Sequence, residues 1–254
     1  MSAAYHIVIP ARLASERLPD KPLLEIGGRP MIEHVYRRAS ESSARTVVVA
    51  TDSRRVFEVV SAFGGTAVMT AKDHQSGTDR IAECADLMGW PDDVVVVNLQ
   101  GDEPLMPAAC LDQAAYVIEQ SGTADVATLY WPIDSAHEVE DSNVVKVVAD
   151  AAGQALYFSR SVIPHPRNQG VEDAMRAGSV WNRHIGLYAY SVRALRAFSS
   201  LSVSPLERLE KLEQLRFLEA GFRIAVAQAC CFIPAGVDTP DDLERVRQLI
   251  SAPA

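Results

Sequence analysis

Short apolar runs alternate with amphipathic stretches along the first half of the chain. The runs at 46–51 and 94–100 each hold consecutive valines, and another run begins at Ile7 and breaks at Pro10. Such runs are typical of strands buried on both faces of a sheet. The pattern predicts strands at 7–10, 46–51, 66–70, 94–100 and 125–131, alternating with helices at 31–40, 56–63, 76–88 and 107–120.

This alternation predicts an α/β fold, with a mostly parallel, doubly wound sheet flanked by helices and the strand at 94–100 near its centre. The rhythm changes between about 132 and 200. Strands are predicted there at 143–150 and 155–159, joined by a turn at Gly153, and again at 183–191. We therefore expect a single domain over 1–254 with an inserted antiparallel lobe at about 132–200.

The last third of the chain predicts a helix at 205–221, a strand at 222–228 and a final helix after Pro240. In the first of these helices Glu207 and Lys211 have the spacing of an exposed ion pair. Its leucines recur every third residue, which predicts one buried stripe made of Leu206, Leu209, Leu212, Leu215 and Leu218.

Composition limits the classes of partner. The 254 residues are 48% hydrophobic, enough for an ordinary core, and carry a net charge of −9. That charge argues against a nucleic-acid partner, and an anionic substrate would need a local positive pocket or metal ions. No apolar run approaches membrane-spanning length, and no signal peptide precedes the first strand, so a cytoplasmic protein is expected.

The four cysteines are Cys84, Cys110, Cys230 and Cys231. No C-x-x-C pair occurs, and two of the four are adjacent in sequence. This spacing fits neither a disulfide framework nor a zinc site. We expect reduced, small residues of the core.

Three cations follow the first strand, namely Arg12, Arg17 and Lys21. Irregular sequence at the carboxyl end of such a strand is where open α/β sheets bind ligands, and guanidinium and ammonium groups suit a polyphosphate. A solvated basic loop is the alternative, favoured by the interleaved Glu16 and Asp20. Neither a P-loop nor a G-x-G-x-x-G fingerprint is present.

Further candidates follow other predicted strands. Asp102 comes after the strand at 94–100, where one carboxylate suits Mg²⁺, although a simple turn aspartate is the alternative. Ser76 or Thr78 is a suitable N-cap for the helix at 76–88. Near the C-terminus, the start of a helix accounts for Thr239 as its N-cap and Pro240 as its first residue. It does not require Asp238, which lies just ahead of the N-cap.

Seven motifs occur in an order that resembles the 3-deoxy-manno-octulosonate (Kdo) cytidylyltransferases, a family of sugar nucleotidyltransferases. They are R-x-x-S-x-R-L-P-x-K-P-L, H-Q-S-G-T-x-R, V-N-x-Q-G-D-E-P, Y-F-S-R, R-H-x-G-x-Y, L-E-Q-L-R and V-D-T-P-x-D, and the likeness extends from Ile7 to Arg247. The resemblance implies a Rossmann-like fold and the reaction CTP + Kdo giving CMP-Kdo and pyrophosphate, with Mg²⁺. It also implies a homodimer formed through the lobe, and a role in lipopolysaccharide biosynthesis.

The same resemblance assigns roles residue by residue. The catalytic residues it implies are Arg12, Lys21, Asp102 and Asp238, the two aspartates being metal ligands. The nucleotide-binding residues are Ala11, Arg12, Leu13, Ser15, Arg17, Lys21, Ser76, Gly77, Thr78, Arg80 and Gln100. The sugar-binding residues are Gln100, Arg160, His184, Tyr188, Glu213 and Gln214. Without the resemblance, the last four would be interpreted as cross-strand packing or ordinary surface residues.

Two alternatives remain at the level of sequence. An enzyme for another acid sugar, such as a sialic acid, would keep the phosphate loop and the metal carboxylates. A catalytically silent nucleotide-binding regulator would lack Asp102, Asp238 or Lys21, and the chain has all three. Two departures from the family pattern, Glu16 and Asp20, add negative charge beside the expected triphosphate and bear on nucleotide affinity.

Overall fold

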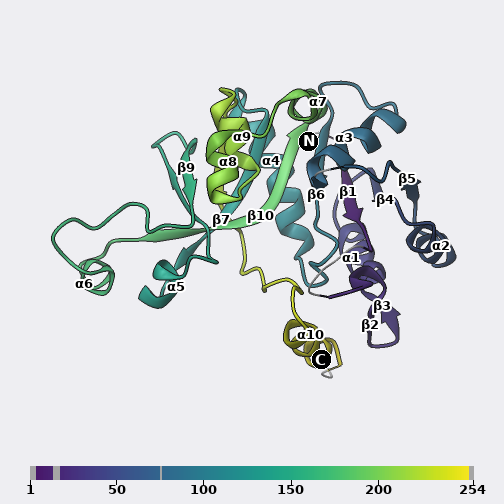
Figure 1. Ribbon diagram of the computed structural model, residues 1–254, viewed down its shortest axis with the longest axis horizontal. Helices are drawn as coiled ribbons and strands as arrows, with labels where there is room; N and C mark the ends of the chain where they lie inside the picture. Colours follow the sequence, from purple (N-terminus) through teal and green to yellow (C-terminus); the bar gives the residue numbers. More distant parts are fainter. Residues whose placement is uncertain (1–3, 14–17, 75, 252–254) are drawn as a thin grey trace.

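The main sheet lies at the centre of the molecule and has the strand order β11-β7-β10-β6-β1-β4-β5. A computed structural model describes residues 4–13, 18–74 and 76–251 of the chain. Figure 1 shows the arrangement of the elements. The strands of this order are β1 (Tyr5–Ala11), β4 (Thr46–Thr51), β5 (Ala67–Met69), β6 (Val95–Asn98), β7 (Val126–Ile133), β10 (Trp181–Ser191) and β11 (Ile224–Gln228). The predicted α/β fold with a mostly parallel sheet is confirmed, and β6 lies in the middle of the order as predicted.

Helices cover both faces of the sheet, as the continuous apolar runs predicted. Along β1, Ile7 and Ile9 belong to one buried cluster and Val8 to another, because successive side chains of a strand point to opposite faces. The first cluster includes residues of α1 (Met31–Ser40), α2 (Arg54–Ala62), α4 (Ala108–Ser121) and α10 (Pro240–Ser251). The second includes residues of α3 (Gly77–Leu87), α7 (Val192–Ser200) and α9 (Gln214–Glu219).

β10 is the antiparallel member of the main sheet, inserted between β6 and β7. Its last four residues, 188–191, pair with β6. Residues 181–185 and 188–190 pair with β7 on the other side, and Arg183 also pairs with Lys146 of the lobe. β10 therefore joins the two parts of the molecule, and it carries His184 and Tyr188 to the edge of the central crevice.

An antiparallel lobe projects from one end of the sheet (Figure 1). It contains α5 (Ala136–Glu140), β8 (Lys146–Ala149), β9 (Ala155–Ser159) and α6 (Val171–Arg176). Lys146 is fully buried there, and its ammonium donates hydrogen bonds to the carbonyls of Asp141, Val144 and Arg160 at 2.7–2.8 Å. The limits expected for the lobe, about 132–200, also enclose the part of β10 that lies in the main sheet.

The predicted helix at 205–221 is wrong. Two short helices occupy the region, α8 (Pro205–Glu210) and α9, and between them Lys211 has a left-handed backbone with φ of 57°. A three-residue repeat turns by about 60° per step around an α-helix, so five such leucines cannot share one stripe. Accordingly Leu209 is 81% exposed, and Glu207 is buried against Arg216 instead of pairing with Lys211 at the surface.

The remaining short elements lie beside the first strand. They are η1 (Lys21–Leu23) and the hairpin of β2 (Glu25–Ile26) and β3 (Arg29–Pro30). Arg247 of α10 donates from Nε to the Glu25 carbonyl at 3.0 Å, which holds the C-terminal helix against this hairpin. Among the described residues, no helix is long and apolar enough to cross a membrane.

Candidate functional site

A cavity of about 490 Å³ opens at the carboxyl ends of β1 and β6. Its volume lies in the range usual for small-molecule sites, about 300–1,000 Å³. Twelve of the residues expected from sequence line it: Ala11, Arg12, Ser76, Gly77, Thr78, Arg80, Gln100, Asp102, His184, Tyr188, Glu213 and Gln214. The position agrees with the rule that open α/β sheets bind ligands at this edge.

Some expected residues lie elsewhere. The lining residues do not include Leu13, Lys21, Asp238 or Arg160. Lys21 nevertheless donates hydrogen bonds to Asp102, which lines the cavity, and to Asp238. Ser15 and Arg17 lie outside the described residues. Sequence reasoning missed several lining side chains, namely His74, Asn98, Tyr190, Lys211, Leu212 and Phe217. His74, Asn98 and Leu212 are members of the motifs H-Q-S-G-T-x-R, V-N-x-Q-G-D-E-P and L-E-Q-L-R, and these motifs were the signal that could have found them. Lys211 and Phe217 flank the last of these motifs, whereas Tyr190 had no signal beyond its place in an apolar strand.

Two carboxylates and one ammonium meet at one end of the cavity. Lys21 Nζ lies 2.6 Å from Asp102 Oδ2 and 2.9 Å from Asp238 Oδ1. Burial works to lower the pKa of Lys21, but the two carboxylates outweigh it and the net pKa is raised. The two aspartates therefore lie close together, as the family resemblance implied. Their carboxylates hold the ammonium of Lys21 between them.

The local structure explains how Asp238 reaches this point. Thr239 Oγ1 accepts a hydrogen bond from Asp242 N, and the Asp242 carboxylate accepts from the backbone N–H groups of Asp238 and Thr239. This reciprocal cap confirms the predicted start of α10. Val237 N donates to the Asp102 carbonyl at 2.9 Å, so the segment before α10 is tied directly to the loop after β6.

Glu103 is a third carboxylate at this end, and the sequence assigned it no role. Burial, followed by repulsion from Asp102 and Asp238, raises its pKa to about 8. It lines a smaller cavity of about 200 Å³ together with Gly236 and Asp242. Glu103 is therefore mostly protonated near pH 7 and adds little charge to that of Asp102 and Asp238.

Gly236 allows the Asp238 segment to approach this loop, and substitution should separate the two. A Cβ at Gly236 would lie 2.9 Å from Glu103 Oε1 and 3.0 Å from the Asp102 carbonyl oxygen, and the backbone atom cannot move aside freely. We expect Gly236→Ala to lower the free energy of unfolding by about 1–3 kcal/mol. Urea unfolding would measure the effect.

Gly170 provides the matched control, because a Cβ there meets nothing within 4 Å. Gly170→Ala should leave the free energy of unfolding nearly unchanged. If Gly236→Ala behaved in the same way, the close approach of the two segments would not restrict the residue at position 236.

The amino end of α3 forms a second side of the cavity. Ser76 Oγ accepts from Asp79 N at 3.0 Å, which confirms Ser76 as the N-cap. Thr78 Oγ1 donates to Glu213 Oε2 at 2.9 Å and so links α3 to the α8–α9 region. Arg80 is 3% exposed and is held by Asp52 and Thr70, at 2.9 and 2.6 Å.

The cavity wall also holds two buried polar atoms without partners among the described residues. Tyr188 Oη and Gln214 Nε2 are buried and form no hydrogen bond in the described part of the chain. An unsatisfied buried polar group costs about 1–3 kcal/mol and therefore needs an explanation. Both residues line the cavity, so a ligand there would supply the missing partners.

His184 lies beside Tyr188, with ring centroids 5.3 Å apart. Its Nε2 lies 3.0 Å from Thr128 Oγ1, whose own proton is directed to the carbonyl of Ile185 or Leu187. Thr128 can then only accept from His184, which places the imidazole proton on Nε2 and leaves Nδ1 as an acceptor. Burial lowers the pKa of His184 to about 3, so the ring is neutral near pH 7 and a poor general base.

The lowered pKa of His184 predicts acid sensitivity. His184 binds a proton near pH 6.5 in the unfolded chain but only near pH 3 in the folded chain. Its contribution to the free energy of unfolding is therefore fully present above pH 6.5 and is lost as the pH falls below that value. The loss is at most about 1.4 kcal/mol per pH unit. His184→Gln should therefore show a shallower decline than the parent between pH 6.5 and 4 in urea unfolding, whereas exposed His165→Gln should follow the parent. Parallel curves for His184→Gln and the parent would contradict the neutral, buried ring.

Two further residues differ from their expected surroundings. Arg160 donates from Nε to the Glu210 carbonyl and from Nη1 to the Ser142 carbonyl, between the lobe and α8. Asp20 has a left-handed backbone with φ of 56°, a conformation that glycine adopts more easily. Its carboxylate pairs with Arg55 at 2.7 Å. Arg55 therefore compensates part of the negative charge that Asp20 adds beside the expected triphosphate.

The fold of this chain matches that of nucleotidyltransferases of known structure. The cytidylyltransferase family model matches residues 6–224. The 3-deoxy-manno-octulosonate cytidylyltransferase of Xanthomonas campestris pv. campestris (strain B100) is 53% identical over 255 residues, which cover 99% of this chain and 90% of the relative. The 3-deoxy-manno-octulosonate cytidylyltransferase of Pseudomonas fluorescens (strain SBW25) is 50% identical over 254 residues, which cover 99% of this chain and 100% of the relative.

Among solved structures, CMP:2-keto-3-deoxy-manno-octonic acid synthetase complexed with CTP matches with a TM-score of 0.90 and 43% identity, over 98% of this chain and 99% of that chain. A 4-diphosphocytidyl-2C-methyl-D-erythritol synthase, 16% identical over 99% of this chain and 100% of that chain, shares the fold with a TM-score of 0.62. This chain belongs to the 3-deoxy-manno-octulosonate cytidylyltransferase family. Enzymes of this kind typically use a divalent metal ion.

Proposed function

We propose that this protein transfers CMP from CTP to Kdo, releasing pyrophosphate and forming CMP-Kdo for lipopolysaccharide biosynthesis. The observation that carries the proposal is that one cavity combines two kinds of group. Asp102 on its wall holds a cation jointly with Asp238, and Tyr188 and Gln214, whose buried polar atoms form no hydrogen bond within the described residues, line it as well. A nucleoside triphosphate with its metal ion and a polyhydroxylated acid sugar match these two groups in charge and hydrogen-bonding capacity.

The nucleotide is assigned to the side formed by β1 and α3. Arg12 and Lys21 would bind phosphate oxygens, because both cations stand at the carboxyl edge of β1 near Asp102. The N-terminus of α3 at Ser76–Thr78 offers backbone N–H groups beside Gly77, where a pyrimidine would approach closely. Arg80 donates hydrogen bonds to Asp52 and Thr70, which hold its guanidinium in place. We therefore assign Arg80 to orienting this wall, and it would contact a ligand without moving.

The sugar is assigned to the wall formed by β10 and α9. Tyr188 Oη, Gln214 Nε2 and the free acceptor of His184 would bind hydroxyl groups. Glu213 belongs to the same wall, and burial raises its pKa even though Thr78 donates a hydrogen bond to it. Lys211, on the left-handed turn between α8 and α9, also lines the cavity. Its ammonium suits the carboxylate of an acid sugar.

Mg²⁺ is the ion we assign to Asp102 and Asp238, because hard oxygen ligands and few protein carboxylates fit its preference. When bound, it neutralises phosphate charge and lowers the pKa of an attacking hydroxyl. The protein itself positions the anomeric hydroxyl in line with the α-phosphorus and the leaving pyrophosphate opposite. This assignment needs no general base, consistent with the low pKa of His184.

We further propose a homodimer formed through the lobe, and a cytoplasmic location, where CTP is made. Leu156 on β9 and Val180 just before β10 are each 61% exposed, an unusual position for apolar side chains. A second copy of the lobe would cover them. Sedimentation at several concentrations would measure the association, and a monomer at micromolar concentration would exclude the dimer.

The test of the proposed function is pyrophosphate release from CTP and Mg²⁺, with Kdo or a sialic acid as acceptor. We expect pyrophosphate release when the acceptor is Kdo and none when it is the sialic acid. Release only with the sialic acid would keep the reaction and change the substrate. Tight CTP binding without release from either sugar would indicate a nucleotide-binding regulator.

Tyr188→Phe tests the sugar site. The Tyr188 hydroxyl forms no hydrogen bond with any described residue, so its removal costs none within that part of the chain, but it removes one to the sugar. We expect the KM for Kdo to rise about tenfold, which corresponds to about 1.4 kcal/mol, with the KM for CTP unchanged. Tyr116→Phe, at an exposed position of α4, is the control. Equal KM values for the sugar in both variants would remove Tyr188 from the sugar site.

A further inference from the structure

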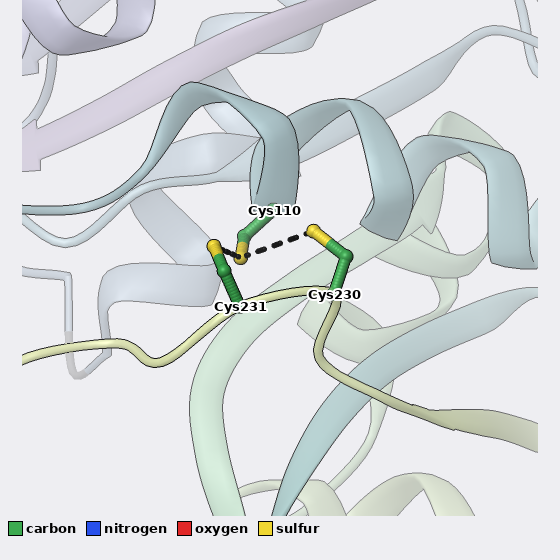
Figure 2. Close-up of side chains that lie close together, drawn as sticks. All are labelled: Cys110, Cys230 and Cys231. Atoms are coloured by element: carbon green, nitrogen blue, oxygen red, sulfur yellow. Dashed lines mark hydrogen bonds between the residues drawn. The ribbon is translucent and has the colours of Figure 1, made fainter.

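Three thiols that are far apart in sequence meet on the side of the sheet covered by α4 (Figure 2). Cys110 comes from the first turn of α4, and Cys230 and Cys231 come from the segment after β11. Cys110 Sγ lies 3.8 Å from Cys230 Sγ and 3.6 Å from Cys231 Sγ, and all three sulfurs lie within 4.8 Å of one another. The expectation of small core cysteines holds for Cys84 and Cys110 but is wrong for Cys230, which is exposed.

The sulfur spacing is that of a metal–thiolate centre. Zinc–sulfur bonds are about 2.3 Å long, so two thiolates on one tetrahedral ion lie about 3.8 Å apart. Two of the three sulfur pairs already have this separation. We propose that Cys110, Cys230 and Cys231 form a three-thiolate site for a soft cation, Zn²⁺ or Cu⁺. The proposal is independent of the assigned CMP transfer.

The chemistry of the ligands selects against the ion expected at the aspartates. The described cluster contains sulfur ligands only, whereas Asp102 and Asp238 offer only oxygen. Thiolates favour Zn²⁺ and Cu⁺ and carboxylates favour Mg²⁺. The two sites should therefore be filled by different ions without competition.

The number of thiols favours a metal over a disulfide. One ion can take all three sulfurs as ligands, whereas any disulfide would leave one of the three unpaired.

The surrounding contacts hold the cysteine segment against α4. Gln113, one turn after Cys110, accepts from Cys230 N at 2.8 Å and donates to the Gln228 carbonyl at 2.7 Å. Ala229 N donates to the Tyr130 carbonyl at 2.9 Å, which fixes the segment to β7. Cys230 is exposed and Cys231 partly so, which gives an ion an entry path from solvent. Ligands that are already positioned reduce the ordering cost of binding.

The experiment uses the reduced full-length chain under anaerobic conditions. Equilibrium dialysis with Zn²⁺ should give one bound ion per chain beyond any bound by the triple variant Cys110→Ser/Cys230→Ser/Cys231→Ser, in the presence of excess Mg²⁺. Cu⁺ would be tested in the same way with a colorimetric chelator as competitor. Bound ion should also protect these three thiols from alkylation, measured by peptide mass spectrometry. Neither readout depends on enzyme activity.

Single variants assign the ligands. Cys230→Ser is at the surface and should fold normally, and we expect its Zn²⁺ affinity to fall at least about tenfold. Cys84→Ala is the matched control, because Cys84 is buried on the other face of the sheet, and it should bind as the parent does. Two outcomes would overturn the proposal: equal Zn²⁺ and Cu⁺ binding by parent and triple variant, or oxidation of two of the three thiols in air with no ion bound by the reduced chain.

Discussion

Replacing Asp102 by asparagine is expected to lower Kdo-dependent pyrophosphate release by about a thousandfold or more. The amide is neutral and a weak ligand for Mg²⁺, and a bound metal contributes several kcal/mol of charge stabilisation to reactions of this kind. Asp238→Asn should act in the same direction, because Lys21 contacts both carboxylates and shows them to share one cation position. Steady-state rates at saturating CTP, over a range of Mg²⁺ concentrations, would measure the loss.

CTP binding should separate this effect from misfolding. The nucleotide is assigned to Arg12 and the amino end of α3, which the substitution leaves in place, so calorimetric CTP affinity should change much less than the rate. Asp173→Asn, whose side chain is 69% exposed in the lobe, should match the parent in both measurements. Asp102→Asn with the rate and Mg²⁺ dependence of the parent would contradict the role assigned to this residue.

The largest stability change is expected at the buried ion pair of Glu207 and Arg216. Their side chains are 9% and 7% exposed, and the guanidinium donates to both carboxylate oxygens at 2.5 and 2.7 Å. Arg216 also lies 4.0 Å from the ring centroid of Phe198. Glu207→Ala leaves the guanidinium buried without its counter-charge, so we expect a loss of about 3–5 kcal/mol in the free energy of unfolding.

Urea denaturation would measure this loss against an exposed pair of the same composition. Glu172 and Arg176 are 68% and 69% exposed, so Glu172→Ala should cost at most about 1 kcal/mol. The double variant Glu207→Leu/Arg216→Met should regain much of the lost stability, because it removes both buried charges. Similar costs for Glu207→Ala and Glu172→Ala would show that the buried pair is not important. Because Gln214 is in the same short helix as Arg216, the KM for Kdo should also rise in Glu207→Ala.

The sequence predicted most of the architecture wherever the signal was local. Consecutive valines marked β4 and β6, and the helix starts at Ser76 and Thr239 were recognisable because an N-cap and its partner lie within a few residues. The helix at 205–221 failed because the repeat of leucines was interpreted without its angular drift. The capping box at Ser204 and the turn at Lys211 decide the structure there.

Sequence alone determined the class of fold, the helix caps at Ser76 and Thr239 and, through ordered motifs, twelve of the residues that line the cavity. Tertiary structure decided how they meet. It placed Lys21 between carboxylates that lie 81 and 217 residues further along the chain. It also joined Cys110 to Cys230 and Cys231, and left Tyr188 Oη unpartnered beside the cavity. The physical reason is that periodicity and caps act within a few residues, whereas these contacts depend on the order of strands in the sheet, which no short stretch of sequence specifies.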